Sequence, residues 1–280
     1  MIDAVLGLHM NPLTCGVAKY NHALAKRLGV PYEPTTRSYN HVHPLYSLKS
    51  SEIAYGNIDI GPRPRGTYDV LWHDRGEAPG TKRFTQYAAR VFYADDIGCP
   101  ATIEGNPDRG SIDVLCFGMS HKFLTPRFQC LKALLDATGE DYTVSLSTGI
   151  HEGTPWDVGF TANMALMRDI FGSHLRCLGF LADDGLAREL RHVQVAALFF
   201  DPAVRANNTS LWAALEAGVP TITNLDAHSP KELQHHVSVY DLDQLSEFPR
   251  EAARHREVRF GGSKAAQAYN WDHLLSVLHA

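Results

Sequence analysis

The sequence predicts an α/β protein built from two Rossmann-like domains, because three observations indicate that buried strands alternate with helices. The apolar run at 195–200 suits a strand buried on both faces, and a polar loop, a short helix and a strand at 219–223 follow it. The start of the chain repeats this order, with an apolar run at 4–8, a turn-rich loop and a helix. A cluster of Gly, Pro, Asn and Asp residues at 98–110 separates the two series.

The first predicted domain spans residues 1–108 and opens with the strand at 4–8. The loop after this strand contains Gly16, and apolar residues at helical spacing then predict a helix over 17–28. A strand, a glycine-containing loop and a helix form the phosphate-facing turn of many α/β proteins. A single glycine is also compatible with a plain connection, so this pattern alone leaves both interpretations open.

Two further parts of the first domain bear on function. Residues 33–67 contain four prolines and several aromatic residues, which fits either an acceptor-binding surface or a connection packed on the domain. Residues 68–74 predict a buried strand, and open α/β sheets bind ligands at the edge where their strands end. His73 is therefore a candidate site residue, with a structural histidine at a strand end as the alternative.

The second predicted domain spans residues 109–262, and residues 263–280 are expected to form a closing helix. Strands are predicted at 113–117 and 142–146, each as a short apolar run between turn signals. The segment 175–181 precedes a further predicted helix, which ends near His192. The second half of the chain therefore repeats the strand and helix alternation of the first.

Composition and charge exclude several classes of protein. The 280 residues are 44% hydrophobic and 20% charged, as is typical of a globular protein. The net charge is −5 and lies in the second half, since residues 1–108 balance 11 basic against 11 acidic residues while residues 109–280 carry 15 and 20. A protein that binds DNA or an anionic membrane would show the opposite distribution, so we expect no nucleic-acid partner.

Targeting, redox and metal signals are absent from the sequence. The start has no basic segment of a signal peptide, and no apolar stretch approaches the roughly 18 residues of a membrane span. The five cysteines are odd in number and form no C-x-x-C pair, which indicates reduced thiols in a cytoplasmic protein. The closest histidine clusters, His41 with His43 and His235 with His236, lack the spacing of a metal site. We therefore expect neither a metal nor a cofactor.

The strongest functional signal lies between residues 197 and 226. The loop residues Asn207, Asn208, Thr209 and Ser210 have side chains that cap helices, and the helix N-terminus behind them presents free amide groups suited to a phosphate. Glu216 falls in the last turn of this helix, where the dipole disfavours an acid by roughly 0.3–1 kcal/mol. A solvated surface glutamate is the alternative to a functional one.

This segment resembles the donor-binding segment of nucleotide-sugar glycosyltransferases with the GT-B fold, of the retaining family-4 type (glycosyltransferases group 1). The resemblance lies in Asn-Asn-Thr-Ser at 207–210 followed by Leu-Trp-Ala-Ala-Leu-Glu-Ala-Gly-Val-Pro. It implies that Glu216 holds the ribose hydroxyls and that the helix N-terminus holds the diphosphate. It also implies two domains facing a central cleft, with a C-terminal helix crossing back to the first domain. A second glutamate usual in the family is replaced here by Asn208.

The same resemblance implies roles in the second domain. Gly118 would lie in the turn after the first strand, and the backbone at Phe180 and Leu181 would border the nucleobase. Where the family has an arginine after the glycine, this chain has a methionine, which leaves His121 and Lys122 as cationic candidates for the diphosphate. An ordinary surface lysine is the alternative for Lys122.

In the first domain, Gly16 resembles a glycine of the loop that faces donor and acceptor, and His73 resembles a histidine near the transferred sugar. The resemblance therefore predicts a glycosyltransferase that moves a sugar from a nucleotide-sugar donor to a saccharide or small-molecule acceptor. Retention of configuration and independence of metal are implied. Two alternatives stay open: a nucleotide-sugar epimerase of the same architecture, and a catalytically inactive module that binds sugar nucleotides.

Overall fold

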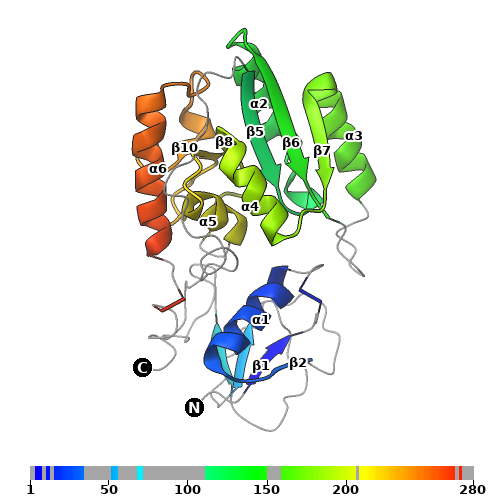
Figure 1. Cartoon of the computed structure of the whole chain (residues 1–280), viewed down its shortest axis with the longest axis vertical. Helices are drawn as coiled ribbons and strands as arrows, with labels where there is room; N and C mark the ends of the chain where they lie inside the picture. Colours follow the sequence, from blue (N-terminus) through cyan, green and yellow to red (C-terminus); the bar gives the residue numbers. More distant parts are fainter. Residues whose placement is uncertain are drawn as a thin grey trace. The chain divides into compact units, whose positions relative to one another are not determined.

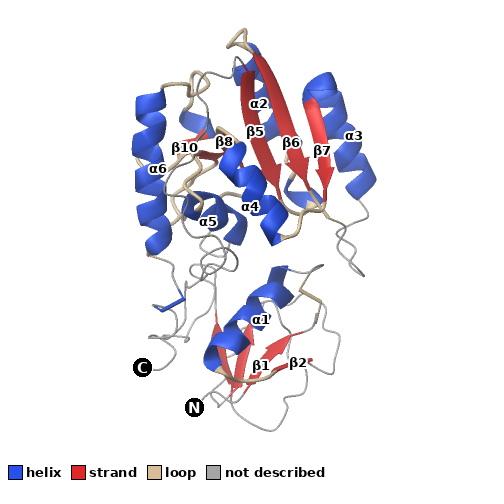
Figure 2. Ribbon diagram, in the orientation of Figure 1, coloured by secondary structure: helices blue, strands red, loops and turns tan. Residues whose placement is uncertain are grey.

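A computed structural model of the chain describes residues 4–7, 11–12, 16–34, 52–55, 68–71, 111–149, 159–205, 208–268 and 271–272. Contacts within the chain divide it into two units. The first unit comprises residues 1–91, 205–207 and 269–280, and the second comprises 92–204 and 208–268. Each unit contains a parallel sheet with helices, which confirms the predicted α/β class (Figures 1 and 2). The predicted domain boundary at 108 and 109 lies outside the described residues.

The first unit contains a four-stranded sheet of order β2-β1-β3-β4, and all three strand pairs are parallel. Its elements are β1 (Ala4–Gly7), α1 (Gly16–Leu28), β2 (Tyr32–Pro34), β3 (Glu52–Tyr55) and β4 (Tyr68–Leu71). The strand predicted at 4–8 and the helix predicted over 17–28 are both present. Pro34 lies on the edge strand, where its missing N–H removes no central ladder bond.

The segment 33–67, interpreted from its sequence as an acceptor-binding surface or a packed connection, contains a strand of the sheet. Strand β3 lies inside it and pairs with both β1 and β4. Strand β3 has only four residues, and the prolines on either side of it obscure so short an apolar signal. The strand predicted at 68–74 is described over Tyr68–Leu71.

The second unit contains a six-stranded parallel sheet of order β10-β9-β8-β5-β6-β7 (Figure 1). Its strands are β5 (Ser111–Phe117), β6 (Asp141–Ser147), β7 (Leu175–Gly179), β8 (Val195–Ala197), β9 (Thr221–Thr223) and β10 (Tyr240–Asp241). Its helices are α2 (Thr125–Asp136), α3 (Phe160–Phe171), α4 (Asp183–His192), α5 (Thr209–Glu216) and α6 (Ala252–Gln267), with single 3-10 turns η1 (Ser120–Lys122), η3 (Gly172–His174) and η4 (Leu242–Gln244). This is the doubly wound strand order of a Rossmann fold.

Helices cover both faces of this sheet. Right-handed crossovers place α2 and α3 on one face and α4 and α5 on the other, and Figure 2 shows α4 in front of the sheet and α2 behind it. Helix α2 buries Phe128, Leu131 and Leu135, which follow helical spacing. Phe128 meets Phe199 edge to face, with ring centres 5.0 Å apart. One core therefore runs from α2 through the central strands.

The end of the chain differs from the expected closing helix over 263–280. Helix α6 begins at Ala252, so it extends across the expected start, and the change from the second unit to the first falls after Ala268. Gly261 and Gly262 lie against the neighbouring backbone, since a Cβ atom on Gly261 would come within 1.9 Å of the Val237 carbonyl oxygen. Beyond α6, Trp271 is buried and the Arg27 guanidinium lies 4.5 Å from its ring centre within the first unit. None of the described helices has the length and apolarity to span a bilayer.

Candidate functional site

The strand order of the second unit reverses between β5 and β8. The chain continues from β5 to β6 and β7 on one side, and from β8 to β9 and β10 on the other. In open parallel sheets, ligands bind beyond the carboxyl ends of the strands at such a point, because the loops on the two sides diverge there. The segments that meet at this edge are the turn after β5, the loop after β8 and the N-terminus of α5.

The turn after β5 depends on Gly118. Its φ angle is +139°, a conformation that side chains disfavour, and its N–H donates to the Ser147 carbonyl at 3.1 Å. A Cβ atom at this position would lie 3.3 Å from Cδ of Lys122. Gly118 therefore makes room for the aliphatic stem of Lys122, which ends the 3-10 turn η1.

Lys122 is the cation at this edge. Its side chain is half-buried, and its Nζ atom lies 5.5 Å from the centre of the Phe200 ring. Burial lowers the pKa of Lys122 to about 8, because the charged form loses hydration. The ammonium group is thus still charged at neutral pH, and the face of Phe200 provides part of its stabilisation.

Asn224, at the end of β9, fixes the loop that carries Phe200. The side chain of this fully buried residue accepts a hydrogen bond from the Phe200 N–H at 2.9 Å and donates to the carbonyls of Phe200 and Pro202 at 2.8 and 2.9 Å. The Thr223 hydroxyl donates to the Leu198 carbonyl at 2.7 Å. These bonds place Phe200 opposite the turn that holds Lys122.

Helix α5 points its N-terminus into the same edge. Asn208 is the N-cap residue, and its side chain makes no capping bond to the helix. The first amide groups of any helix lack carbonyl partners within it, and they carry partial positive charge. Ser210 and Lys122 line one small cavity of about 10 Å³, a space of roughly one water molecule. A cation and a helix N-terminus therefore converge at the switch point.

Three hydroxyl groups at this edge are buried without a hydrogen-bond partner among the described residues. They belong to Ser120 after β5, Thr148 after β6 and Ser210 in α5, which are at most 9% exposed. A buried polar group without a partner costs roughly 1–3 kcal/mol. Their clustering at one sheet edge is what a site for a polar ligand requires, because a ligand can supply the missing partners.

An exposed aromatic ring lies in the loop after β7, against the loop after β6. Phe180 follows β7 and is 56% exposed, although its ring packs so closely on Gly149 that a Cβ atom there would lie 2.9 Å from it. The Thr148 N–H donates to the Gly179 carbonyl at 3.0 Å and ties the two loops together. A planar, accessible ring held in place this way can stack against a ligand ring.

The structure brings some of the predicted residues together at this edge and separates others. Gly118, Lys122, Phe180, Leu181, Asn208, Thr209 and Ser210 all follow the carboxyl ends of β5, β7 or β8. Gly16 is the first residue of α1 in the other unit. His73 and Asn207 lie outside the described residues, and of His121 only the backbone, in the turn η1, is described.

Glu216 is not brought to this cluster. It is the last residue of α5, six positions after Ser210, and six residues of α-helix rise about 9 Å. Helix α5 leads back toward the start of β9, so Glu216 lies toward the opposite edge of the sheet from the helix N-terminus. Its role as a ribose ligand stays a prediction.

Sequence patterns missed four residues that build this site. Phe200 falls at the end of an apolar run that predicts only core, and Asn224 at the start of a loop. Ser120 and Thr148 are single hydroxyl residues after strands, without any motif around them. The available signal is positional: each of the four follows a strand of the parallel sheet, and such positions meet at one edge.

Within the described part of the chain, Cys116 is the one cysteine that is buried, and it lies in β5. Burial raises the pKa of the Cys116 thiol, so this residue of β5 is neutral and unreactive. Among the described residues, no three His, Cys, Asp or Glu side chains gather closely enough to hold a metal ion. The independence of metal predicted from the sequence is not tested by this observation.

Comparison with known proteins gives likeness in structure alone. No family model matches the chain, and no curated protein matches it in sequence. The C-terminal domain of a glycosyl transferase group 1 family protein from Francisella tularensis shares 12% identity, with 57% of this chain and 86% of that one covered and a TM-score of 0.40.

Two larger solved structures are also similar. Sucrose-phosphate synthase from Thermosynechococcus elongatus shares 16% identity over 75% of this chain and 56% of its own, with a TM-score of 0.49. A UDP-forming trehalose-phosphate synthase from Burkholderia xenovorans shares 15% identity over 61% and 45%, with a TM-score of 0.45. This chain thus spans about half the length of these two enzymes. At these identities and TM-scores, the likeness assigns neither an activity nor a substrate to it.

Proposed function

We propose that the chain is a glycosyltransferase of the GT-B type, which transfers a sugar from a nucleotide-sugar donor to a saccharide or small-molecule acceptor. In this proposal the second unit holds the donor and the first unit holds the acceptor. Retention of configuration, catalysis without a metal and a cytoplasmic location belong to the same proposal. The donor nucleotide and the acceptor are left unspecified.

The observation that carries the proposal is the convergence of Lys122 and the N-terminus of α5 at the switch point. Both carry positive charge, and the hydroxyl groups of Ser120, Thr148 and Ser210 provide buried polar atoms beside them. A diphosphate is an anion with many acceptor oxygens, and it matches this combination of a helix N-terminus, a cation and hydroxyl donors. The Phe180 ring, at the same edge, is suited to the nucleobase.

The reaction that fits this arrangement is the departure of a nucleoside diphosphate from the anomeric carbon. As the glycosidic bond breaks, negative charge grows on the leaving phosphate oxygen. Lys122 and the amide groups of α5 are oriented before the reaction and stabilise that charge as it forms. Because burial lowers the pKa of Lys122 to about 8, this residue can also give its proton to the leaving group more readily than an exposed lysine.

A screen of sugar nucleotides tests the proposal directly. UDP- and GDP-sugars are first compared by the rise in melting temperature, since a ligand at 100 times its dissociation constant adds about 2.7 kcal/mol of stability. Release of UDP or GDP is then measured with and without candidate saccharide acceptors. Acceptor-stimulated release supports the transferase, whereas conversion of the sugar without release identifies an epimerase.

A matched pair of lysine variants controls this experiment. Lys122→Met should weaken donor binding and slow the release on the order of 10²-fold, while Lys231→Met, which removes an exposed lysine, should preserve both. If no sugar nucleotide raises the melting temperature and none is cleaved, the proposed function is wrong. If binding occurs and neither release nor conversion follows, the chain is a binding module.

A further inference from the structure

The second unit has a large cavity at the opposite, amino edge of its sheet. Its volume is about 880 Å³, and it is formed where β5, β8 and β9 begin, below the start of α6. The residues at the strand starts include Ser111, Gln194 and Pro220. The whole length of the parallel strands therefore separates this cavity from Lys122 and the α5 N-terminus.

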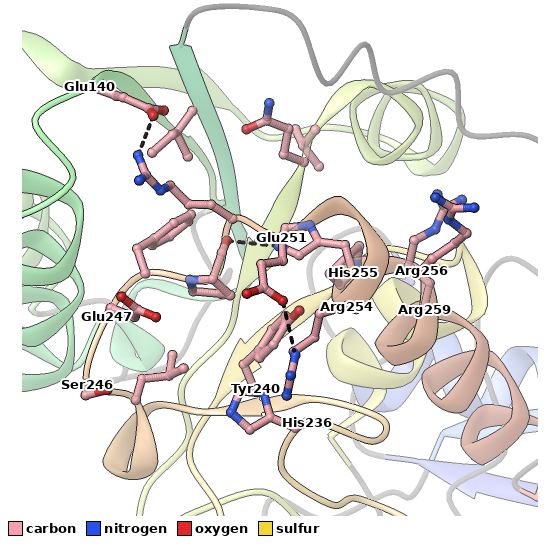
Figure 3. Close-up of a pocket in the computed structure, with 18 of the residues that line it drawn as sticks. Glu140, His236, Tyr240, Ser246, Glu247, Glu251, Arg254, His255, Arg256 and Arg259 are labelled. Carbon is pink, nitrogen blue, oxygen red and sulfur yellow. Dashed lines mark hydrogen bonds and ion pairs between the residues drawn. The ribbon is translucent and has the colours of Figure 1, made fainter.

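The cavity is lined by more cations than anions. Four arginines border it, Arg250, Arg254, Arg256 and Arg259, against three acids, Glu140, Glu247 and Glu251. Two of the acids are engaged: Arg250 bonds Glu140, and the Arg254 guanidinium lies 3.7 Å from Glu251 (Figure 3). Arg256 and Arg259 are three positions apart on α6, a spacing that places two side chains on one face of a helix.

The N-terminus of α6 adds positive potential to the same space. This helix has 16 residues, and the Glu251 side chain at its N-cap makes no capping bond. The first amide groups of the helix therefore lack a side-chain partner from the cap. A long helix gives its N-terminus about half a positive charge, which attracts an anion.

Two buried polar atoms face this cavity without a hydrogen-bond partner among the described residues. They are the Tyr240 hydroxyl and the Nδ1 atom of His236. Tyr240 is 0% exposed, and Figure 3 shows it below Glu251 and Arg254 and next to His236. Burial raises the pKa of Tyr240, so its hydroxyl keeps its proton and can donate a hydrogen bond.

His236 is held in an unfavourable backbone conformation. Its φ angle is +60°, the one positive value that the described residues other than glycine adopt. The His236 N–H donates to the Val239 carbonyl at 2.9 Å, and its ring meets that of Tyr240 edge to face with centres 5.6 Å apart. Strain of this kind costs about 1–3 kcal/mol and tends to mark functional positions.

We propose that this cavity is a second ligand site, which binds a phosphorylated small molecule. Guanidinium groups match phosphate oxygens in pairs of hydrogen bonds, and the arginines of α6 provide them at the rim. The Tyr240 hydroxyl and the His236 ring nitrogen provide donors at the floor. The phosphate group binds the arginines at the rim of the cavity. The cavity volume suits a ligand of metabolite size.

Calorimetric titration with inorganic pyrophosphate tests this site on the full chain. Because the carboxyl edge also suits a diphosphate, the titration is done in the Lys122→Met background, where that edge lacks its cation. The proposal predicts that the Lys122→Met protein still binds pyrophosphate. Adding Arg256→Gln and Arg259→Gln should weaken this binding by at least about tenfold, since each charged hydrogen bond is a large contributor to affinity.

Tyr240→Phe is the sharpest variant, because it removes only a hydroxyl that has no hydrogen-bond partner among the described residues. It should weaken pyrophosphate by about five- to tenfold while the melting temperature stays equal or rises. Arg188→Gln, which removes an exposed arginine of α4 away from the cavity, is the control and should bind as its parent does. Absence of binding in Lys122→Met at millimolar pyrophosphate overturns the proposal. Equal affinity of the Tyr240→Phe and double-arginine variants to their parent overturns it too.

Discussion

The two edges of the sheet in the second unit differ in the size of the cavity that lies beside their buried polar groups. At the carboxyl edge, Lys122 and Ser210 line a space of about 10 Å³. At the amino edge, Tyr240 and His236 face about 880 Å³ of open cavity. Both edges bury hydroxyl groups that have no hydrogen-bond partner among the described residues, and of the two cavities the one at the amino edge is far larger.

This difference indicates how each edge would accept a ligand. At the carboxyl edge, a diphosphate would compete with the Phe200 ring for the Lys122 ammonium group. A ligand at the amino edge enters existing space, and the arginines there already have acidic neighbours that it must compete with. The carboxyl edge therefore depends on one desolvated cation and the amino edge on several hydrated ones.

The largest effect is expected from removing Lys122, the cation that lines one cavity with Ser210 of α5. Lys122→Met should lower kcat of sugar transfer on the order of 10²-fold, comparable with losing one donor to a developing oxyanion, and should also weaken donor binding. The stability of the variant should rise, because a charge penalised by burial is replaced by an apolar side chain of similar length. Steady-state kinetics and melting curves beside Lys231→Met check both parts. An unchanged kcat would make Lys122 a structural residue.

Asn224 tests whether the carboxyl edge is preorganised by its loop. Asn224→Ala removes three hydrogen bonds to Phe200 and Pro202 and leaves buried backbone groups without partners, so unfolding free energy should fall by about 2 kcal/mol. Asn163→Ala, which loses one bond of 3.0 Å to the Ser120 carbonyl, is the matched control and should lose about 1 kcal/mol. Equal losses in urea titrations of the two variants would show that the loop after β8 needs no such anchor.

Much of the fold follows from local sequence. Runs such as 113–117 and 142–146 are long enough, and bounded clearly enough by turns, to predict β5 and β6. The end of β8 escapes this reasoning: the apolar run predicts a strand to residue 200, but β8 has three residues, because Leu198, Phe199 and Phe200 stay buried after the chain has left the regular ladder. Helix α6 escapes it as well, because Gly261 and Gly262 lower its helical propensity while tight packing against residues 237 and 238 favours them.

The site was predictable only in part, for a physical reason. Lys122, Gly118 and Ser210 lie in turns whose sequence already suggests a ligand loop. Their partners, Phe200 and Asn224, are distant in sequence and meet them only because the sheet order places β8 and β9 beside β5. The amino-edge cavity gave no signal at all, since its arginines resemble a solvated helix face until Tyr240 is seen beneath them.

The pH dependence of ligand binding distinguishes Lys122 at the carboxyl edge from the arginines at the amino edge. Since the pKa of Lys122 is about 8, donor affinity should fall as the pH rises above that value, by about tenfold for each pH unit. Stability should move in the opposite direction. Between the folded pKa near 8 and the unfolded value of 10.5, the unfolded chain binds more protons, so this group makes the folded state more stable as pH increases.

Calorimetry and melting curves across this range check the two trends. Arginines keep their charge over the same range, so pyrophosphate binding at the amino edge should show no loss of affinity as the pH rises above 8. Lys122→Met is the control, because it should bind the donor weakly at every pH and show a reduced stability trend. Donor affinity that stays constant above pH 8 in the wild-type protein would contradict the assignment of Lys122 as the donor cation.

The smallest effect distinguishes the two ends of helix α5. Ser210 lies in its first turn with a buried hydroxyl that no described residue bonds, and Glu216 is its last residue, about 9 Å away along the axis. Ser210→Ala should weaken donor binding by about fivefold, the value of one neutral hydrogen bond, without loss of stability.

Glu216→Gln should leave donor affinity within about twofold if the helix N-terminus alone contacts the donor, because a ligand there does not reach the last turn. The ribose role implied by family resemblance gives the opposite result, a loss of about 10- to 100-fold for Glu216→Gln. Titration of one sugar nucleotide into both variants decides whether the donor contacts only the first turn of α5 or also reaches Glu216 in its last turn.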